Sequence, residues 1–119
     1  MKKMIVLEYP KCGTCRKALK WLKDNNITFE DRKIHEEKPT EAELRKWHAE
    51  SGLPLNKMFN TSGKLYRELN LKEKLKTMTD DEKYALLASD GMLVKRPVVV
   101  KDSTVLIGFK EDDWKEKLL

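Results

Sequence analysis

The sequence predicts one α/β domain, and three observations carry that prediction. The chain has 119 residues, which is the length of a single domain. A strand–helix–strand unit fits within about 30 residues near its start. A β-hairpin and a helix close the chain, and helical patterns fill about residues 40–90 between the two ends. We therefore expect a single domain over residues 1–119 with a helical insertion.

The N-terminal unit begins with the nearly continuous apolar stretch Met4–Tyr9, which is typical of a strand buried on both faces. Pro10 ends this strand. Apolar side chains then recur at helical spacing, at Cys15, Ala18, Leu19 and Leu22. Alternation over residues 27–30 predicts a second strand. The two strands of such a unit run parallel, with a right-handed crossover.

The middle of the chain is predicted to be helical. The capping-box pattern Thr-x-x-Glu occurs at Thr40 and again at Thr79. In this motif the Thr hydroxyl accepts from a free backbone amide, and the Glu side chain reaches back. Gly52 and Gly91 are expected to end these two helices, with shorter helical segments over residues 54–59 and 62–69 between them.

The C-terminal third returns to β-structure. The β-branched run Val98–Val100 predicts a strand, residues 101–103 a turn, and Thr104–Ile107 the return strand. Asp112 and Asp113 favour the start of a last helix, since carboxylates stabilise a helix N-terminus. Without the middle helices, the order βαβ…ββα is that of a thioredoxin-like core with a small mixed sheet.

Composition excludes several classes of protein. The longest apolar run has five residues, whereas a membrane-spanning helix needs about 20. The apolar stretch near the start ends at Glu8, too early for the roughly 7–15 apolar residues of a secretory signal. The net charge is +5, with most of the excess in residues 1–39, but basic and acidic residues are interspersed without a basic stripe, which argues against direct nucleic-acid binding. We expect a cytoplasmic protein that does not bind a membrane.

The strongest signal for function is the pair Cys12 and Cys15, placed between a strand and a helix start. Free amides and the dipole at a helix N-terminus favour the thiolate of Cys12. Basic neighbours add to this effect, and such sites lower a cysteine pKa from about 8.5 to roughly 3.5–7.5. These neighbours are Lys11, Arg16 and Lys17. Cys12 is predicted to be the nucleophile, and Cys15, one helical turn further and more buried, the resolving thiol.

Two neighbours of the pair carry further expectations. Gly13 is expected to let the backbone turn tightly and to keep Cys12 accessible. Glu8 would raise the pKa of the thiol if it lay close, but we expect its side chain to turn to solvent.

Two other interpretations of the cysteine pair remain open. A structural zinc site needs four ligands, and His35 and His48 are spaced more widely than the 3–5 residues of a zinc finger. Free cysteines also occur as small buried hydrophobic residues. The C-x-x-C spacing beside a βαβ pattern favours thiol redox chemistry, without a metal.

Arg96 and Pro97 form a second signal, directly before the valine strand. In a thioredoxin-like fold a cis proline at this place faces the reactive cysteine, and the residue before it is presented to the substrate. A guanidinium binds carboxylates and oxyanions through its planar fork. The alternative is an exposed basic residue before a proline that opens a strand.

Three blocks of the sequence resemble the arsenate reductase (ArsC)/Spx family: Tyr9–Ala18, Gly91–Val100 and Gly108–Asp113. The resemblance implies a thioredoxin-like fold with a helical insertion between the second and third strands, and thiol chemistry at Cys12 and Cys15. The substrate-binding residues it implies are Gly13, Thr14, Arg16, Arg96 and Pro97.

The two branches of this family differ in function. Glutaredoxin-dependent arsenate reductases hold arsenate with three arginines. Arg96 matches one of them, but Asn60 and Gly108 stand near the other two, so we expect weak arsenate reduction. Spx regulators share the C-x-x-C motif and bind the C-terminal domain of the RNA polymerase α subunit, at a surface where Gly52 corresponds to a contact glycine.

The resemblance therefore implies a cytoplasmic, monomeric thiol/disulfide oxidoreductase of the arsenate-reductase-like type. It would hold no cofactor and would be reduced by an external thiol, with glutathione and glutaredoxin or thioredoxin as partner. The alternative is an Spx-type redox-sensing transcription regulator whose partner is the RNA polymerase α subunit.

Overall fold

The computed structural model describes residues 4–119; Met1–Lys3, part of the segment weighed above as a signal, lie outside the described residues. Four strands form one mixed sheet in the order β2-β1-β3-β4. β1 and β2 are parallel and β3 and β4 form an antiparallel hairpin, as the sequence predicts, and β3 also pairs antiparallel with β1. The strands are β1 (Ile5–Glu8), β2 (Glu30–Lys33), β3 (Val98–Lys101) and β4 (Thr104–Ile107).

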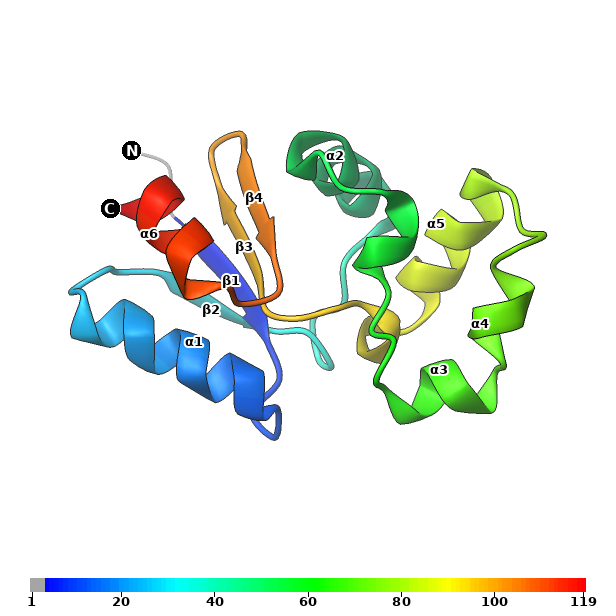
Figure 1. Cartoon of the computed structure of the whole chain (residues 1–119), viewed down its shortest axis with the longest axis horizontal. Coiled ribbons are helices and arrows are strands. Elements are labelled where there is room, and N and C mark those ends of the chain that lie inside the picture. The colour runs from blue at the N-terminus through cyan, green and yellow to red at the C-terminus, as the bar shows by residue number, and fades with distance from the viewer. Residues whose placement is uncertain (1–3) are drawn as a thin grey trace.

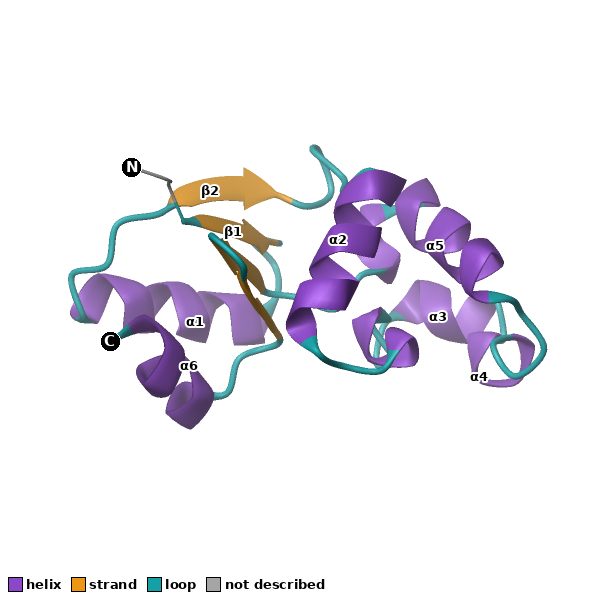
Figure 2. Cartoon of the chain, turned by 90° about the horizontal axis from the view of Figure 1, so that it is seen from above, coloured by secondary structure: helices purple, strands orange, loops and turns teal. Residues whose placement is uncertain are grey.

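Helices cover both faces of this sheet. Helices α1 (Gly13–Asp24) and α6 (Glu111–Leu118) lie on one face, and the helical insertion lies on the other (Figures 1 and 2). The predicted α/β architecture with helices between the second and third strands is thereby confirmed. The insertion comprises α2 (Glu41–Ser51), η1 (Leu55–Met58), α3 (Lys64–Glu68), α4 (Leu71–Lys74), α5 (Asp80–Ser89) and η2 (Gly91–Leu93), the two η segments being 3₁₀-helices.

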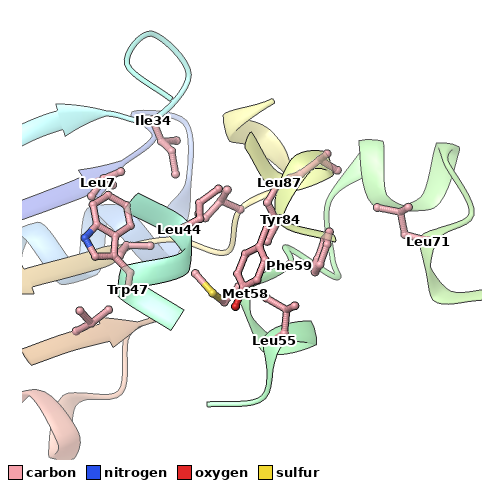
Figure 3. Close-up of a cluster of buried hydrophobic side chains, with 14 of the residues drawn as sticks. Leu7, Ile34, Leu44, Trp47, Leu55, Met58, Phe59, Leu71, Tyr84 and Leu87 are labelled. Atoms are coloured by element: carbon pink, nitrogen blue, oxygen red, sulfur yellow. The ribbon is translucent and has the colours of Figure 1, made fainter. Parts of the chain in front are cut away.

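Strand alternation divides the core into two clusters. Val6 and Val99 face α1 and α6, where they pack with Trp21 and Trp114. Their neighbours in the strands, Leu7 among them, point to the opposite face and join the side chains of the insertion (Figure 3). Successive strand residues point to opposite faces, so a sheet covered on both sides requires continuous apolar strands. The valine run therefore serves both clusters.

Three local expectations need correction. The second strand is Glu30–Lys33 rather than residues 27–30: it pairs with β1 from Ile5↔Glu30 to Glu8↔Lys33, while residues 27 and 29 pack beneath it against the α1–α6 cluster. An edge strand can be this polar because one side faces solvent. Helix α5 ends at Ser89, so Gly91 begins η2 instead of ending α5, and α4 had not been expected.

Both capping boxes are formed. The hydroxyls of Thr40 and Thr79 accept from the amides of Glu43 and Glu82, and both glutamates reach back. Glu43 also forms a two-pronged ion pair with Arg32 of β2, at 2.8 and 3.0 Å, and so joins the insertion to the sheet. Gly52 ends α2 in the left-handed conformation, as expected.

Gly91 of the insertion packs tightly against the residue that follows β2, Ile34. A Cβ at this position would stand 2.1 Å from the backbone oxygen of Ile34, whose side chain is fully buried. We expect Gly91→Ala to lower the free energy of unfolding by roughly 1–3 kcal/mol or more, because the backbone of both segments must shift.

Urea unfolding monitored by tryptophan fluorescence measures this loss, with Gly13→Ala as the control. A Cβ on Gly13 meets nothing within 4 Å, and this first helical residue has no left-handed φ. The control should be neutral or slightly stabilising, since alanine favours helix. Equal losses for the two variants would contradict the packing argument.

Candidate functional site

The start of α1 brings the two cysteines together. Cys12 is the N-cap of α1, and its Sγ accepts the backbone N–H of Cys15 at 3.4 Å. The Cys12 N–H donates to the Tyr9 carbonyl at 3.0 Å, which forms a turn directly before the helix. Cys12 is half-buried and Cys15 fully buried, and both thiols are free. The pair thus has one accessible and one shielded sulfur.

The environment separates the acidities of the two thiols. Partial burial acts to raise the pKa of Cys12, but hydrogen bonds from the thiol and amide of Cys15 and the charge of Arg96 outweigh it, so the pKa is lowered. Burial, with the neighbouring Cys12 sulfur, raises the pKa of Cys15 to about 12. Cys12 is therefore the thiol that ionises first.

Arg96 supplies the cation at this site. Its guanidinium lies over the Tyr9 ring, 5.1 Å from the centroid, and Nη1 donates to the Met92 carbonyl at 3.5 Å. The Nε is buried and has no hydrogen-bond partner among the described residues. The Arg96–Pro97 bond is cis. Arg96 is half-buried beside Cys12, not an exposed residue ahead of the strand.

The expectation that Lys11, Arg16 and Lys17 lower the pKa of Cys12 is wrong. The cation that lowers the pKa of Cys12 is Arg96, not the cluster beside the cysteine in sequence. Arg16 instead donates its Nε to the Pro10 carbonyl at 2.9 Å, and Lys11 and Lys17 are exposed. Helical geometry explains this for Arg16 and Lys17, which follow the N-cap and project sideways from α1. Lys11 lies in the turn before the helix, whereas Arg96 comes from a segment facing the helix end.

The expectation that the Glu8 side chain turns to solvent is also wrong. Its side chain is 2% exposed and accepts from the Lys33 ammonium at 2.9 Å. The parallel register places Lys33 beside Glu8, so the lysine ammonium, rather than water, stabilises the charge of the buried carboxylate. Burial and the nearby Asp31 raise the pKa of Glu8 despite this partner.

A cleft of about 530 Å³, here named the Cys12 cleft, opens beside the nucleophile. It contains three of the sequence-predicted site residues, Cys12, Thr14 and Arg96; Gly13, Cys15, Arg16 and Pro97 do not line it. Its other lining residues are Asn60, Ser62, Gly63, Lys64, Lys95, Ile107, Gly108, Phe109 and Lys110.

The walls of the cleft come from segments far apart in sequence. Residues 60–64 of the insertion form one wall, and residues 107–110, between β4 and α6, form the other. Backbone hydrogen bonds hold the first wall in place: Asn60 donates to Leu93 and Lys95 to Met58, both at 2.8 Å. Sequence reasoning missed Lys95, although its place next to Arg96 was a usable signal.

Residues 4–119 contain no group of three or more metal-ligating side chains close enough to hold a metal ion. The two histidines pack against different tyrosines: His35 lies edge-on to Tyr9 and His48 contacts Tyr84. Within the same described range, no helix combines the length and apolar character needed to cross a membrane.

The sheet order, the insertion and the cysteine pair at the start of α1 define a thioredoxin-like protein with a C-x-x-C motif. The chain belongs to the ArsC family, whose family model matches residues 7–117. The resemblance seen in the three sequence blocks is thus confirmed.

The sequence relatives include an uncharacterized protein, a regulatory protein and a transcriptional regulator. The chain is 55% identical over 108 residues to the uncharacterized protein YusI of Bacillus subtilis (strain 168), covering 91% of this chain and 92% of YusI. It is 32% identical over 101 residues to the regulatory protein MgsR of the same organism, covering 85% and 79%. It is 26% identical over 104 residues to the global transcriptional regulator Spx of Staphylococcus epidermidis, covering 87% and 78%.

Solved structures share the fold over nearly the whole chain. An ArsC family related protein from Bacteroides fragilis is 52% identical, with a TM-score of 0.93 and coverage of 97% of this chain and 98% of that one. Arsenate reductase from Vibrio cholerae is 28% identical, with a TM-score of 0.85 and coverage of 97% of both chains. These relatives support a thiol-dependent, oxidoreductase-like class.

Proposed function

We propose that the protein is a thiol/disulfide oxidoreductase in which Cys12 attacks a substrate disulfide and Cys15 resolves the product. The observation that carries this proposal is the asymmetry of the pair. Cys12 is accessible, has a lowered pKa and caps α1, whereas Cys15 is buried and has its pKa raised to about 12. A nucleophile must be a thiolate near neutral pH, and a resolving thiol must stay protonated and shielded until it is needed.

The reaction would proceed in two exchange steps. The Cys12 thiolate attacks one sulfur of the substrate disulfide, which forms a mixed disulfide and releases the other half as a thiolate. Cys15 then loses its proton and attacks the Cys12 sulfur, which closes the Cys12–Cys15 disulfide and releases the second half. The substrate gains two electrons and the protein loses two, so an external thiol or dithiol, of the glutathione or thioredoxin type, must return them.

Arg96 would serve both steps. Its charge favours the Cys12 thiolate in the resting protein. Its place in the Cys12 cleft would also let it stabilise the negative charge that develops on the leaving sulfur. Thr14, which lines the cleft one residue before Cys15, would contact the bound substrate.

Trapping with a Cys15→Ser variant tests the proposal. The change removes the resolving thiol, so we expect the variant to accumulate a stable mixed disulfide at Cys12 when mixed with a small disulfide. Intact mass spectrometry detects one adduct per chain. Wild-type protein should show a loss of two hydrogens and no adduct, because Cys15 expels the second half.

Cys12→Ser is the matched control and should form no adduct, since the thiol of Cys15 is buried and protonated. Adducts on Cys12→Ser at the rate seen for Cys15→Ser would overturn the assignment of roles. Wild-type protein that keeps two alkylatable thiols after treatment would overturn the redox function itself.

A regulator that binds RNA polymerase is the second candidate function. The similarity to MgsR and Spx supports it. So does the exposed end of α2, where Gly52 is followed by Leu53, a large apolar residue 38% exposed. Calorimetric titration with the C-terminal domain of the polymerase α subunit tests this candidate. Saturable binding that Leu53→Glu abolishes would favour a regulator; no binding in either redox state would exclude this partner.

A further inference from the structure

The Cys12 cleft is lined by cations on all its sides. Lys64 comes from the insertion wall, Lys110 from the wall that precedes α6, and Lys95 and Arg96 from the segment between them. No aspartate or glutamate is among the residues that line this cleft. A surface of interspersed charges, as the rest of this chain has, would be expected to mix both signs at such a place.

The Lys95 side chain extends to the opposite wall of the cleft, beside Gly108. Its Cε lies 3.0 Å, and its Nζ 3.7 Å, from the point where a Cβ on Gly108 would stand. Gly108 has a φ of 79°, which favours glycine, and the missing side chain leaves the space that the lysine occupies. The ammonium group of Lys95 is therefore set between the two walls.

Two of these lysines form no ion pair within residues 4–119. Lys64 forms an ion pair with Glu68 at 3.7 Å. Within residues 4–119, Lys95 and Lys110 form no salt bridge. Their charges are thus available to a bound molecule, and the cleft has the volume of a small-ligand site.

We propose that the Cys12 cleft selects small disulfides whose thiols carry carboxylates, with Lys95 and Lys110 as the residues that set this specificity. The proposal rests on the proposed function and names its substrate class. An anionic disulfide is repelled by the Cys12 thiolate that must attack it. Cations that surround the reacting sulfurs reverse this repulsion and also stabilise the acidic thiolate that leaves.

In this reaction the Cys12 sulfur forms a bond to one substrate sulfur, and the substrate S–S bond breaks to release an acidic thiolate. Closure of the Cys12–Cys15 disulfide releases the second acidic thiolate. The substrate is reduced by two electrons to two carboxylate-bearing thiols, and a dithiol or monothiol reductant restores the protein.

Three symmetric disulfides of similar size test the proposal: those of mercaptopropionic acid, mercaptoethanol and cysteamine, which are anionic, neutral and cationic. Stopped-flow mixing measures the second-order rate constant of Cys12 with each probe. The variants are Lys95→Gln, Lys110→Gln and their double combination, with Lys46→Gln on an exposed part of α2 as the control. The readout is the anionic rate divided by the neutral rate, because a change in Cys12 acidity alters both alike.

We expect each cleft substitution to lower this ratio roughly two- to five-fold, and the double variant to lower it on the order of ten-fold. The ratio of cationic to neutral rates should rise, and Lys46→Gln should change neither ratio. Added salt should slow the anionic reaction of the wild type more than that of the double variant.

Ratios that stay constant in the double variant, or that change equally in Lys46→Gln, would overturn the assignment of substrate class. Formation of the Cys12–Cys15 disulfide with all three probes would in that case leave the proposed function intact. Failure of all three probes to oxidise the pair would overturn both.

Discussion

At pH 7.5, iodoacetamide is expected to modify Cys12 on the order of a thousand times faster than Cys15. Only the thiolate reacts, and a thiol with a pKa near 12, as burial gives Cys15, holds about a thousandth of the thiolate of an ordinary thiol at the same pH. Hydrogen bonds from Cys15 and the charge of Arg96 give Cys12 a lowered pKa instead. Peptide mapping after timed quenching measures both rates.

The pH dependence of the alkylation rate shows whether the pKa of Cys12 is lowered or raised. The rate at Cys12 should rise with pH and level off below the pH at which a free thiol, with a pKa of about 8.5, would level off. Arg96→Met removes the charge, and with it the guanidinium over the Tyr9 ring, but keeps an unbranched side chain. We expect the pKa of Cys12 to rise and its rate at neutral pH to fall roughly three- to ten-fold, with an unchanged plateau at high pH.

Arg16→Met is the matched control, because Arg16 contacts the Pro10 carbonyl and does not line the Cys12 cleft. It should leave the profile of Cys12 unchanged. If Arg16→Met acted as strongly as Arg96→Met, the local basic cluster would be the source of the acidity. Equal, slow rates at Cys12 and Cys15 would remove the catalytic interpretation and favour a switch read by a protein partner.

Arsenate turnover is expected to be about two to four decades below that of a dedicated arsenate reductase. The positions near which two of the three family arginines are expected are Asn60 and Gly108, and both line the Cys12 cleft with Arg96. Charge-assisted hydrogen bonds contribute roughly 1.5–3 kcal/mol each, so two missing arginines remove on the order of 3–6 kcal/mol of oxyanion stabilisation. An assay coupled to glutathione, glutaredoxin and NADPH measures kcat/KM.

Asn60→Arg tests directly whether the missing arginines limit arsenate turnover, since it restores one guanidinium at the cleft wall. We expect it to raise arsenate kcat/KM about ten-fold or more, while Asn60→Gln should not. Position 108 offers no such route, because its left-handed φ disfavours any residue other than glycine. Wild-type turnover equal to that of a dedicated reductase would show that the lysines replace the arginines fully.

The sequence determined the features that depend on residues close together in the chain. Capping boxes at Thr40 and Thr79, the valine strand and the helical stripe after Cys12 follow rules that span a few residues, and the structure confirms each of them. The order of these elements was enough to predict a thioredoxin-like sheet, because a βαβ unit and a hairpin have few ways to pair. The position of the cysteine pair at a helix start followed from the same local rules.

The tertiary structure alone decided which charges meet the cysteines. Arg96 lies 84 positions after Cys12 in the chain. Only the packing of the segment before β3 against the start of α1 lets Arg96, in place of Lys11 or Arg16, lower the pKa of Cys12. The ion pair of buried Glu8 with Lys33 likewise depends on the register between β1 and β2. Electrostatic effects depend on distance and burial rather than on sequence separation, so the acidity of the site and the sign of its cleft could be obtained only from the folded chain.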